Sequence, residues 1–319
     1  MSVLVFAETS EGKFKKSAFE VTSYGKKVAE QLGTNLVVLA INSNEPTSLH
    51  KYGAEKVLNV ANNDLSFNVK IVADIIKQAA EKENSKVVIL DSNSNGIYLA
   101  PLVSVNLNAG FASNVVALPS AVSPFTVKRK AFSSKAFNFT QIHSDVKVIG
   151  LSKNSFGLAE NEVSGSVEEF SPTITTSGLS SVSIEQTSGK VTIADADIVV
   201  SGGRGLKGPE NWGIVEELAS VLGAATACSK PVSDLGWRPH SEHVGQTGKP
   251  VASNLYIAIG ISGAIQHLAG INSSKVKVVI NTDPEAPFFK AADYGIVGDA
   301  FEVVPKLIEK LKEFKANNA

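Results

Sequence analysis

Residues 255–270 read LYIAIGISGAIQHLAG, and they indicate the architecture of the chain around them. The first five residues are a continuous apolar run, which is typical of a parallel strand buried on both faces. A turn with two glycines follows, and the residues beyond it suit a short helix. We therefore predict a strand, a turn and a helix, with Ser262 capping the helix and free backbone N–H groups forming a site for an anion or a carbonyl.

Short apolar runs and amphipathic stretches alternate through both halves of the chain. This alternation predicts parallel sheets with helices on both faces. We expect an α/β fold with two domains, each built on a mainly parallel sheet flanked by helices, the C-terminal one being doubly wound. The predicted strands are 3–7, 35–41, 56–60, 86–90, 115–118, 126–131, 146–151, 198–201, 255–259, 276–280 and 294–297. The predicted helices include 21–32, 72–79, about 210–222 and one that starts near Pro305.

The length of 319 residues also favours two domains. Between residues 152 and 190 the composition shifts to Ser, Thr, Glu and Gly, with short alternating pieces such as 173–175. We interpret this region as edge strands and a connector, with a flexible linker as the alternative. The predicted domains are residues 1–188, which include the connector at about 152–190, and residues 189–319.

Composition and charge exclude several classes of protein. The 30 Lys and Arg residues balance 31 Asp and Glu residues, which argues against a general nucleic-acid-binding protein. A single cysteine, Cys228, excludes an internal disulfide framework and cysteine-based zinc or iron–sulfur sites. No apolar run approaches the ~20 residues that span a membrane. The N-terminus has neither a basic lead nor a cleavage site, so we expect a cytoplasmic protein that does not span a membrane.

Two glycine-rich segments before residue 255 are candidate ligand contacts. Residues 201–205 read SGGRG directly after a predicted strand, where a ligand can approach the backbone and Arg204 can reach a phosphate or a ring. Residues 244–248 read VGQTG within a long loop, and they offer an amide, a hydroxyl and backbone N–H groups to the edge of a heterocycle. For both segments an ordinary turn is the alternative.

Other polar residues carry weaker signals. His240 and His243 are three residues apart, but no third ligand follows at metal-binding spacing, so we expect exposed histidines and no metal site. Ser262 lacks the Gly-x-Ser-x-Gly pattern of a nucleophile, and we expect no catalytic residue. Asn281 and Asp299 follow predicted strands at the sheet edge where open α/β folds bind ligands. Each could hold ribose hydroxyls or cap a helix.

Residues 255–270, together with 244–248 and 281–287, closely resemble the alpha subunit of electron transfer flavoprotein. The opening residues 3–8 and the two-domain layout also fit, so the likeness covers essentially the whole chain. It implies a heterodimer with a beta subunit that holds AMP, and one FAD held mostly by the C-terminal domain of this chain. It also implies an electron carrier rather than an enzyme, which serves acyl-CoA or related dehydrogenases of fatty acid beta-oxidation and a membrane quinone oxidoreductase.

The resemblance also implies which residues contact the FAD. On one side of the cofactor it places Arg204, Ser229 and Lys230. Along the flavin it places Val244, Gly245, Gln246 and Thr247. At the flavin and its ribityl-phosphate chain it places Ser262, Gly263, Ala264, Ile265, Gln266 and His267, the last of these near the flavin O2. At the adenosine end it places Asn281, Asp299 and Ala300.

This chain departs from the family at one of these positions. The family usually has Ser-Arg where residues 229–230 read Ser-Lys, so the charge is kept and the planar stacking partner is lost. Positive charge at Lys230, Arg204 and, if it is protonated, His267 would favour a negatively charged reduced flavin.

Two other functions compete with the electron carrier. An NAD-dependent enzyme would require a dinucleotide fingerprint and an acid–base pair, and neither is evident in the sequence. A regulatory module that binds a nucleotide without redox chemistry would show no flavin absorption in a visible spectrum.

Overall fold

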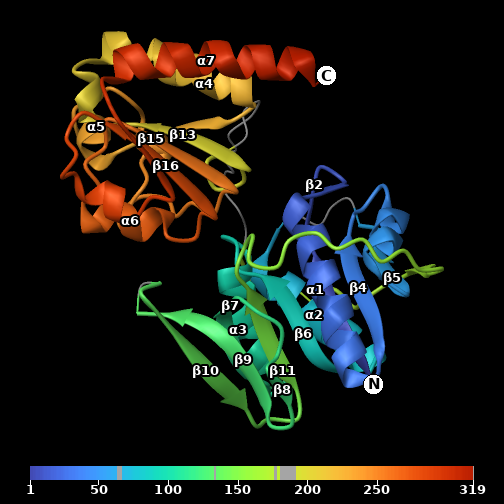
Figure 1. Ribbon diagram of the computed structural model, residues 1–319. Coiled ribbons are helices and arrows are strands. Elements are labelled where there is room, and N and C mark those ends of the chain that lie inside the picture. The colour runs from blue at the N-terminus through green and yellow to red at the C-terminus, as the bar shows by residue number, and fades with distance from the viewer. Residues whose placement is uncertain (63–66, 133, 176–177, 180–191, 319) are drawn as a thin grey trace. The chain divides into compact units, whose positions relative to one another are not determined.

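The structure, a computed structural model, describes residues 1–62, 67–132, 134–175, 178–179 and 192–318. The chain divides into two compact units, Met1–Ile184 and Glu185–Ala319 (Figure 1). Each unit is an α/β fold with a mainly parallel sheet, which confirms the predicted fold class. The predicted domain boundary between 188 and 189 and the end of the predicted connector at 190 lie outside the described residues.

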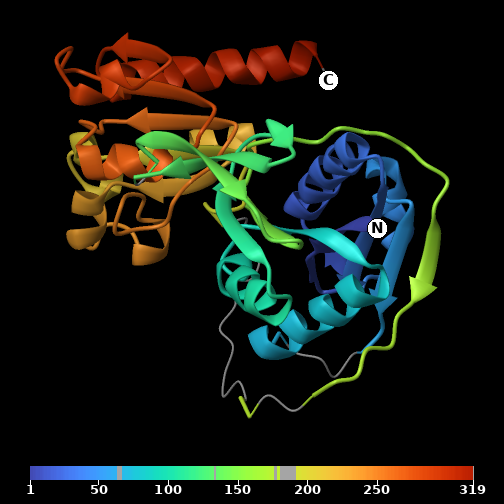
Figure 2. The ribbon, with the colours of Figure 1, turned by 90° about the horizontal axis from the view of Figure 1, so that it is seen from below.

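The N-terminal unit folds around one large sheet. Its strands are β1 (Ser2–Ala7), β2 (Thr9–Ser10), β3 (Lys13–Phe14), β4 (Asn35–Ile41), β5 (Lys56–Val60), β6 (Ser85–Asp91), β7 (Gly110–Val115), β8 (Ala121–Val122), β9 (Phe125–Ala131), β10 (Ala136–Ile142), β11 (Lys147–Leu151) and β12 (Ser166–Glu169). Its helices are α1 (Lys16–Leu32), α2 (Val69–Lys82), α3 (Gly96–Asn106) and a 3-10 helix (Pro46–Tyr52). The sheet order is β10-β9-β7-β11-β6-β1-β4-β5-β12, with β8 paired to β9 and β2 pairing separately with β3. Helix α1 covers one face of the sheet, and α2 and α3 cover the other (Figure 2).

Parts of the N-terminal unit differ from the prediction. The predicted strand at 115–118 is wrong beyond Val115. The chain bulges at Asn114, where φ is 55°, and β7 ends one residue later, at Val115. Helix α3 was not predicted, because its apolar residues form no single face and it contains Pro101. The predicted strand at 173–175 is also wrong. Thr173 instead bonds its N–H and C=O to the side-chain amide of Gln78, each at 2.9 Å.

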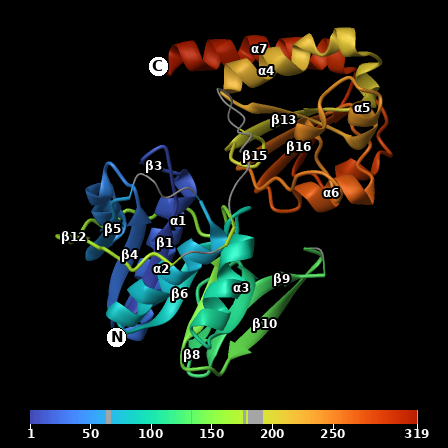
Figure 3. The same ribbon diagram turned by 180° about the vertical axis from the view of Figure 1, so that it is seen from behind.

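The C-terminal unit folds around a five-stranded parallel sheet in the order β14-β13-β15-β16-β17. Its strands are β13 (Ile198–Gly202), β14 (Ala225–Cys228), β15 (Leu255–Ile259), β16 (Val276–Asn281) and β17 (Tyr294–Val297). Its helices are α4 (Gly213–Leu222), α5 (Lys230–Asp234), α6 (Ile265–Ile271) and α7 (Ala300–Asn317), with 3-10 helices at Arg204–Leu206, Pro209–Asn211, His240–Glu242 and Pro287–Lys290. Helices α4 and α7 cover one face and α6 covers the other (Figure 3), which is the predicted doubly wound arrangement.

A buried tryptophan fixes the packing between β13 and the helices above it. Trp212 is 4% exposed and belongs to the core formed by β13, α4 and α7. The indole lies so close to the strand that a Cβ on Gly202 would be 2.6 Å from the ring. The side chain of Arg238 stacks against the same indole, with its guanidinium carbon 5.4 Å from the ring centre.

Two helix starts in this unit were predicted wrongly. Helix α7 begins at Ala300 rather than near Pro305, because the carboxylate of Asp299 accepts a hydrogen bond from the N–H of Phe301 at 2.9 Å and caps the helix. Ser262 does not cap α6, whose N-cap is Ala264 without a side-chain cap. Between them Gly263 has a φ of +87° and turns the chain against Phe288, where a Cβ would be 2.5 Å from the backbone nitrogen.

Candidate cofactor site

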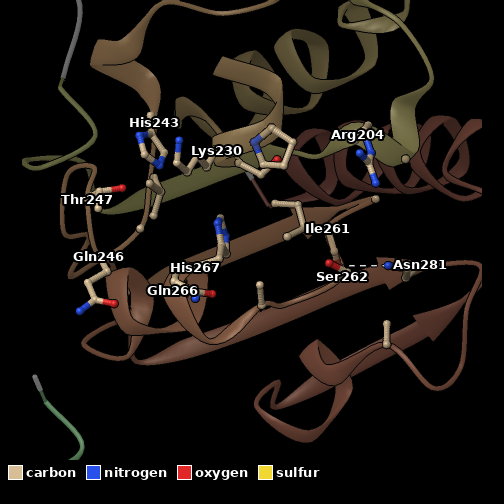
Figure 4. A pocket seen from close by; sticks show the side chains of 18 of the residues that line it. Arg204, Lys230, His243, Gln246, Thr247, Ile261, Ser262, Gln266, His267 and Asn281 are labelled. Carbon is tan, nitrogen blue, oxygen red and sulfur yellow. Dashed lines mark hydrogen bonds between the residues drawn. The ribbon is translucent and has the colours of Figure 1, made fainter. Parts of the chain in front are cut away.

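The order of the strands creates a pocket at the carboxyl edge of the C-terminal sheet. Strands β13 and β15 are neighbours, but the helices that follow them, α4 and α6, pack on opposite faces. The chain therefore leaves a crevice between the two strand ends, where open α/β sheets bind ligands. A pocket of about 620 Å³ lies there, within the size range of cofactor sites (Figure 4). We call it the strand-end pocket.

Each of four neighbouring strands delivers a polar side chain to the strand-end pocket. Arg204 follows β13, Lys230 follows β14, Ser262 follows β15, and Asn281 ends β16. The side chain of Asn281 joins two of these loops, because its Nδ2 donates to the carbonyl of Ile261 at 3.1 Å and its Oδ1 accepts from the N–H of Asp283 at 3.0 Å. These two hydrogen bonds therefore hold the pocket rim between β15 and β16 in place without a ligand.

The loop with Gln246 and Thr247 is held by its backbone. The N–H of Val244 donates to the carbonyl of Cys228 at 3.0 Å, next to the isolated parallel bridge between His243 and Cys228 at the end of β14. The N–H of Gln246 donates to the carbonyl of Gln266 in α6 at 2.8 Å. The side chains of Gln246 and Thr247 are exposed and make no hydrogen bond to any residue that the structure describes. These two side chains are therefore free to bind a ligand without disturbing the loop.

Gly203 and Gly205 allow the turn after β13 to contact the turn after β15. A Cβ on Gly205 would be 2.8 Å from the Cα of Gly260, and one on Gly203 would be 2.1 Å from the carbonyl oxygen of Gly260. Any side chain at these positions would push the turns apart. The contact brings Arg204 and Ser262 to one pocket.

His267 lies in the pocket wall and is neutral. The ring is 6% exposed, and its Nε2 is 3.0 Å from the hydroxyl of Tyr256. Its Nδ1 is buried and makes no hydrogen bond among the described residues. Burial lowers the pKa of His267 to about 4, and the Val244 backbone opposes this only in part. His267 therefore adds no positive charge to the pocket near neutral pH.

The two fixed cations of the pocket differ in their surroundings. The ammonium of Lys230 is paired with the carboxylate of Asp234, one helical turn later, at 2.8 Å. This exposed pair reduces the field that Lys230 exerts on the pocket. Arg204 is exposed and forms no ion pair with any described residue. Arg204 is therefore the stronger source of positive potential in the pocket.

Most of the residues singled out from the sequence line the strand-end pocket. They are Arg204, Ser229, Lys230, Val244, Gly245, Gln246, Thr247, Ser262, Ala264, Gln266, His267 and Asn281. Four others do not line it: Gly263 packs against Phe288, Ile265 is 65% exposed, Asp299 caps α7 and Ala300 is buried at the start of that helix. Lining residues that were not singled out for the cofactor are Gly205, Pro231, His243, Gly260, Ile261, Asp283 and Ala286.

The prediction that His243 is exposed was wrong. It is 2% exposed and lines the strand-end pocket, because its backbone forms an isolated bridge with Cys228 at the end of β14. Burial lowers its pKa, and the charges of His240 and Lys230 act in the same direction. A bridge of one residue has no periodicity, so the sequence carried no signal for it. Within the described ranges, no group of three His, Cys, Asp or Glu residues could hold a metal ion.

Comparison with known proteins assigns this architecture to one family. A family model described as the electron transfer flavoprotein domain matches residues 3–175, and one described as the electron transfer flavoprotein FAD-binding domain matches residues 192–272. The electron transfer flavoprotein subunit alpha of Bacillus subtilis is 36% identical over 99% of this chain and 99% of its own length. The chain belongs to the electron transfer flavoprotein alpha subunit family.

Other members of the family with similar sequences come from an animal and from a further bacterium. The probable mitochondrial electron transfer flavoprotein subunit alpha of Caenorhabditis elegans is 36% identical, over 97% of this chain and 93% of its own length. The protein FixB of Clostridium saccharobutylicum is 34% identical, over 98% and 96% respectively. In this subunit, no helix among the described residues is long and apolar enough to cross a membrane.

The strand-end pocket of this chain fits the FAD that the family model names. The matched FAD-binding domain contains Arg204, Thr247 and His267, which lie on three of the pocket's loops and helices. The exposed side chains of Arg204, Gln246 and Thr247 line the pocket and have no partner among the described residues. A guanidinium, an amide and a hydroxyl are groups that can bind the phosphates and the polar ring edge of a flavin nucleotide.

Proposed function

We propose that this chain binds one FAD in the strand-end pocket as the alpha subunit of a heterodimer. The pair would carry electrons from acyl-CoA or related dehydrogenases to a membrane quinone oxidoreductase. The observation that carries this proposal is a pocket at the carboxyl ends of parallel strands, inside the matched FAD-binding domain, that is lined by unpaired hydrogen-bond donors. FAD supplies the electron chemistry when it is bound. The chain binds and orients it, and no acid–base residue is needed.

The roles of individual residues follow from their surroundings. Arg204 has no acidic partner among the described residues, so its guanidinium is available to a phosphate or to the flavin ring. Gln246 and Thr247 offer unpaired polar side chains to the edge of the ring. Asn281 lies at the far end of the lining, beside Asp283, where the adenosine end is expected. Asp299 and Ala300 were expected at the adenosine end, but neither lines the pocket. Their contact with FAD stays a prediction.

A second protein surface is expected to complete the site. The side chains of Gln246, Thr247, Ser262 and Gln266 all line the pocket and are exposed in this chain. A cofactor held by them would keep one side open to water. We propose that the beta subunit covers this side and holds AMP at a site of its own. We further propose that the heterodimer acts in the cytoplasm.

The proposal is tested with the co-purified pair. The chain is co-expressed with a beta subunit, and the visible spectrum and the FAD content are measured. We expect about one FAD per pair and bleaching of the flavin when catalytic amounts of an acyl-CoA dehydrogenase and an acyl-CoA are added. A colourless pair would contradict FAD binding. Direct oxidation of NADH by the pair, without a dehydrogenase, would favour an NAD-dependent enzyme instead.

A further inference from the structure

The long loop before β15 crosses the carboxyl edge of the C-terminal sheet. Trp237 packs into the core on the α4 face of the sheet, and Val244 packs into the core on the α6 face. The chain therefore passes from one face to the other within residues 238–243. Directly after the crossing, residues 243–247 line the strand-end pocket (Figure 4). We call residues 243–249 the pocket loop.

Backbone hydrogen bonds hold the pocket loop on its α6 side. The loop is closed on itself, since the N–H of Lys249 donates to the carbonyl of His243 at 2.9 Å. It is joined to α6 by the N–H of Gln246, which donates to the carbonyl of Gln266 at 2.8 Å. On the α4 side, no backbone hydrogen bond joins residues 238–242 to any other element that the structure describes. The connection on that side is made by a side chain.

Arg238 makes this connection. Its Nε and Nη2 donate to the two carboxylate oxygens of Glu242 at 2.9 and 2.7 Å, and its Nη1 donates to Oε1 of Glu216 in α4 at 3.2 Å. The guanidinium also lies against the indole of Trp212. The side chains of Arg238 and Glu242 are only 21% and 17% exposed. A bidentate pair in such surroundings is stronger than an exposed one and fixes direction as well as distance.

The bridge from Arg238 ends at the entry of the pocket loop. Glu242 directly precedes His243, whose backbone forms the isolated bridge with Cys228 at the end of β14. Helix α4, at the other end, is packed into the core of the unit. Arg238 therefore ties the entry of the loop to a fixed helix, although Arg238 itself does not line the pocket.

We propose that Arg238 is a positioning residue that holds the pocket loop where Gln246 and Thr247 meet the ligand. It anchors the loop on the α4 side of the sheet, opposite the anchor at Gln266. That the ligand is FAD rests on the proposed function. Without the guanidinium, residues 238–243 are free to shift along the sheet edge, and the loop adopts its binding position for only part of the time. The affinity for the ligand falls in proportion to that fraction.

Hydrogen exchange tests this anchor on the full chain co-purified with its beta subunit. Arg238→Met keeps a long unbranched side chain and removes the three hydrogen bonds of the guanidinium. We expect amide exchange in residues 243–249 to become about 5-fold faster or more, with β16 unchanged. Glu217→Gln is the control, because it breaks an exposed ion pair with Lys312 on the same helix α4 and should leave the pocket loop unchanged.

Outcomes that overturn the anchor are separate from the failure of FAD binding. Wild-type exchange of the pocket loop in Arg238→Met overturns it. An equal rise throughout residues 192–318 also overturns it, because Arg238 would then stabilise the whole unit rather than position the loop. If Arg238→Met does not fold, Glu242→Gln removes the charge at the other end of the bridge and should give the same local rise. A local rise in a pair that binds no FAD supports the anchor and contradicts only the proposed function.

A second measurement connects the anchor to the cofactor. The FAD-loaded pair is diluted, and the dissociation constant of FAD is compared among the variants. We expect Arg238→Met to weaken FAD binding about 2- to 10-fold, which corresponds to a loop in its binding position for about 10–50% of the time. Because Arg238 acts through Glu242, the double variant Arg238→Met/Glu242→Gln should bind FAD no more weakly than the weaker single variant. Wild-type affinity in Arg238→Met, or additive losses in the double variant, would overturn the proposal.

Discussion

Thr247 is the residue whose contribution to the flavin can be isolated most cleanly. Its loop is held by backbone hydrogen bonds of Val244 and Gln246, so its exposed side chain can change without moving the loop. Thr247→Val keeps the shape and removes the hydroxyl. We expect FAD to stay bound and the potential of a one-electron flavin couple to shift by about 20–60 mV, which corresponds to the roughly 0.5–1.5 kcal/mol of one hydrogen bond. A spectroelectrochemical titration that matches wild type would place the hydroxyl away from the ring.

Lys230 and Asp234 form a pair whose members should shift the flavin potential in opposite directions. Asp234→Asn leaves an unpaired ammonium beside the pocket and should raise the potential, because positive charge favours the reduced, anionic flavin. Lys230→Ala leaves the carboxylate and should lower it. Exposed pairs contribute at most about 1 kcal/mol, so the shift of each one-electron potential should stay below about 40 mV and shrink in high salt. Potentials that are equal in both variants would leave Arg204 as the sole effective cation.

Asp91 makes the stability of the N-terminal unit depend on pH. It ends β6, is 7% exposed, and its Oδ2 makes no hydrogen bond among the described residues. Burial raises its pKa to about 6, with Glu20 and Glu8 adding to the rise and Ser17 opposing it. Between the ordinary value of about 4 and this value the folded state binds more protons than the unfolded state. The free energy of unfolding should therefore fall as the pH rises from about 4 to 6.

The variant Asp91→Asn tests this dependence. It keeps an acceptor for Ser17 and removes the buried charge, so it should raise the free energy of unfolding by about 1–3 kcal/mol at pH 7.5 and by little at pH 4. Urea unfolding followed by far-ultraviolet circular dichroism at both pH values measures the difference. Asp145→Asn is the control, since this carboxylate is exposed and paired with Lys86. An equal gain at both pH values would show that Asp91 is not the titrating group.

The residues of the site could be predicted where they lie in a turn at the end of a strand. Arg204, Thr247 and His267 lie in short glycine-rich or polar segments at strand ends, and the pocket gathers all three. His243 was not predictable, because a single backbone bridge to Cys228 buries it. The charge states were also beyond the sequence: the pairing of Lys230 and the neutrality of His267 depend on neighbours that only the fold brings together.

Among the elements, α7 offers a direct test of two roles for one carboxylate. Asp299 was expected at the adenosine end of FAD, with helix capping as the alternative, and the structure shows it capping α7. Asp299→Ala should therefore lower the free energy of unfolding by about 0.5–2 kcal/mol, the usual cost of losing an N-cap, and leave FAD affinity unchanged. Glu302→Ala, in the first turn of the same helix, is the control for charge. Loss of FAD affinity in Asp299→Ala alone would restore the ligand role.

Elements with one clear period were predicted well. The apolar run of β15 has the predicted bounds, and α1 ends at Leu32 as predicted, with Gly33 as its cap at a φ of 61°, although it begins at Lys16, five residues before the predicted start. Elements without a periodic apolar face were not predicted. Helix α3 is apolar without a single face, and β10 has almost no buried side chains, so neither shows a helical or alternating pattern. The start of α7 was also predicted wrongly, because the cap at Asp299, six residues before Pro305, begins the helix.

At the scale of the whole molecule, we expect the chain to hold FAD stably only together with a beta subunit. The polar side chains that line the strand-end pocket are largely exposed, so a cofactor bound by this chain alone would remain open to water on one side. Expressed alone, the chain should be pale or prone to aggregate, and co-expressed it should be yellow. Gel filtration with absorbance at the flavin band measures both. A monodisperse single chain with full FAD occupancy would contradict this expectation.

The position of Trp212 has a practical consequence for fluorescence. The sequence contains two tryptophans, Trp212 and Trp237, and both belong to the C-terminal unit. Tryptophan emission of the intact chain therefore reports that unit alone, while circular dichroism reports both. If the units unfold independently in urea, the two signals will separate, and one titration will give the stability of each. Bound flavin absorbs near the wavelengths at which indole emits, so quenching of Trp212 can also follow cofactor loading in real time.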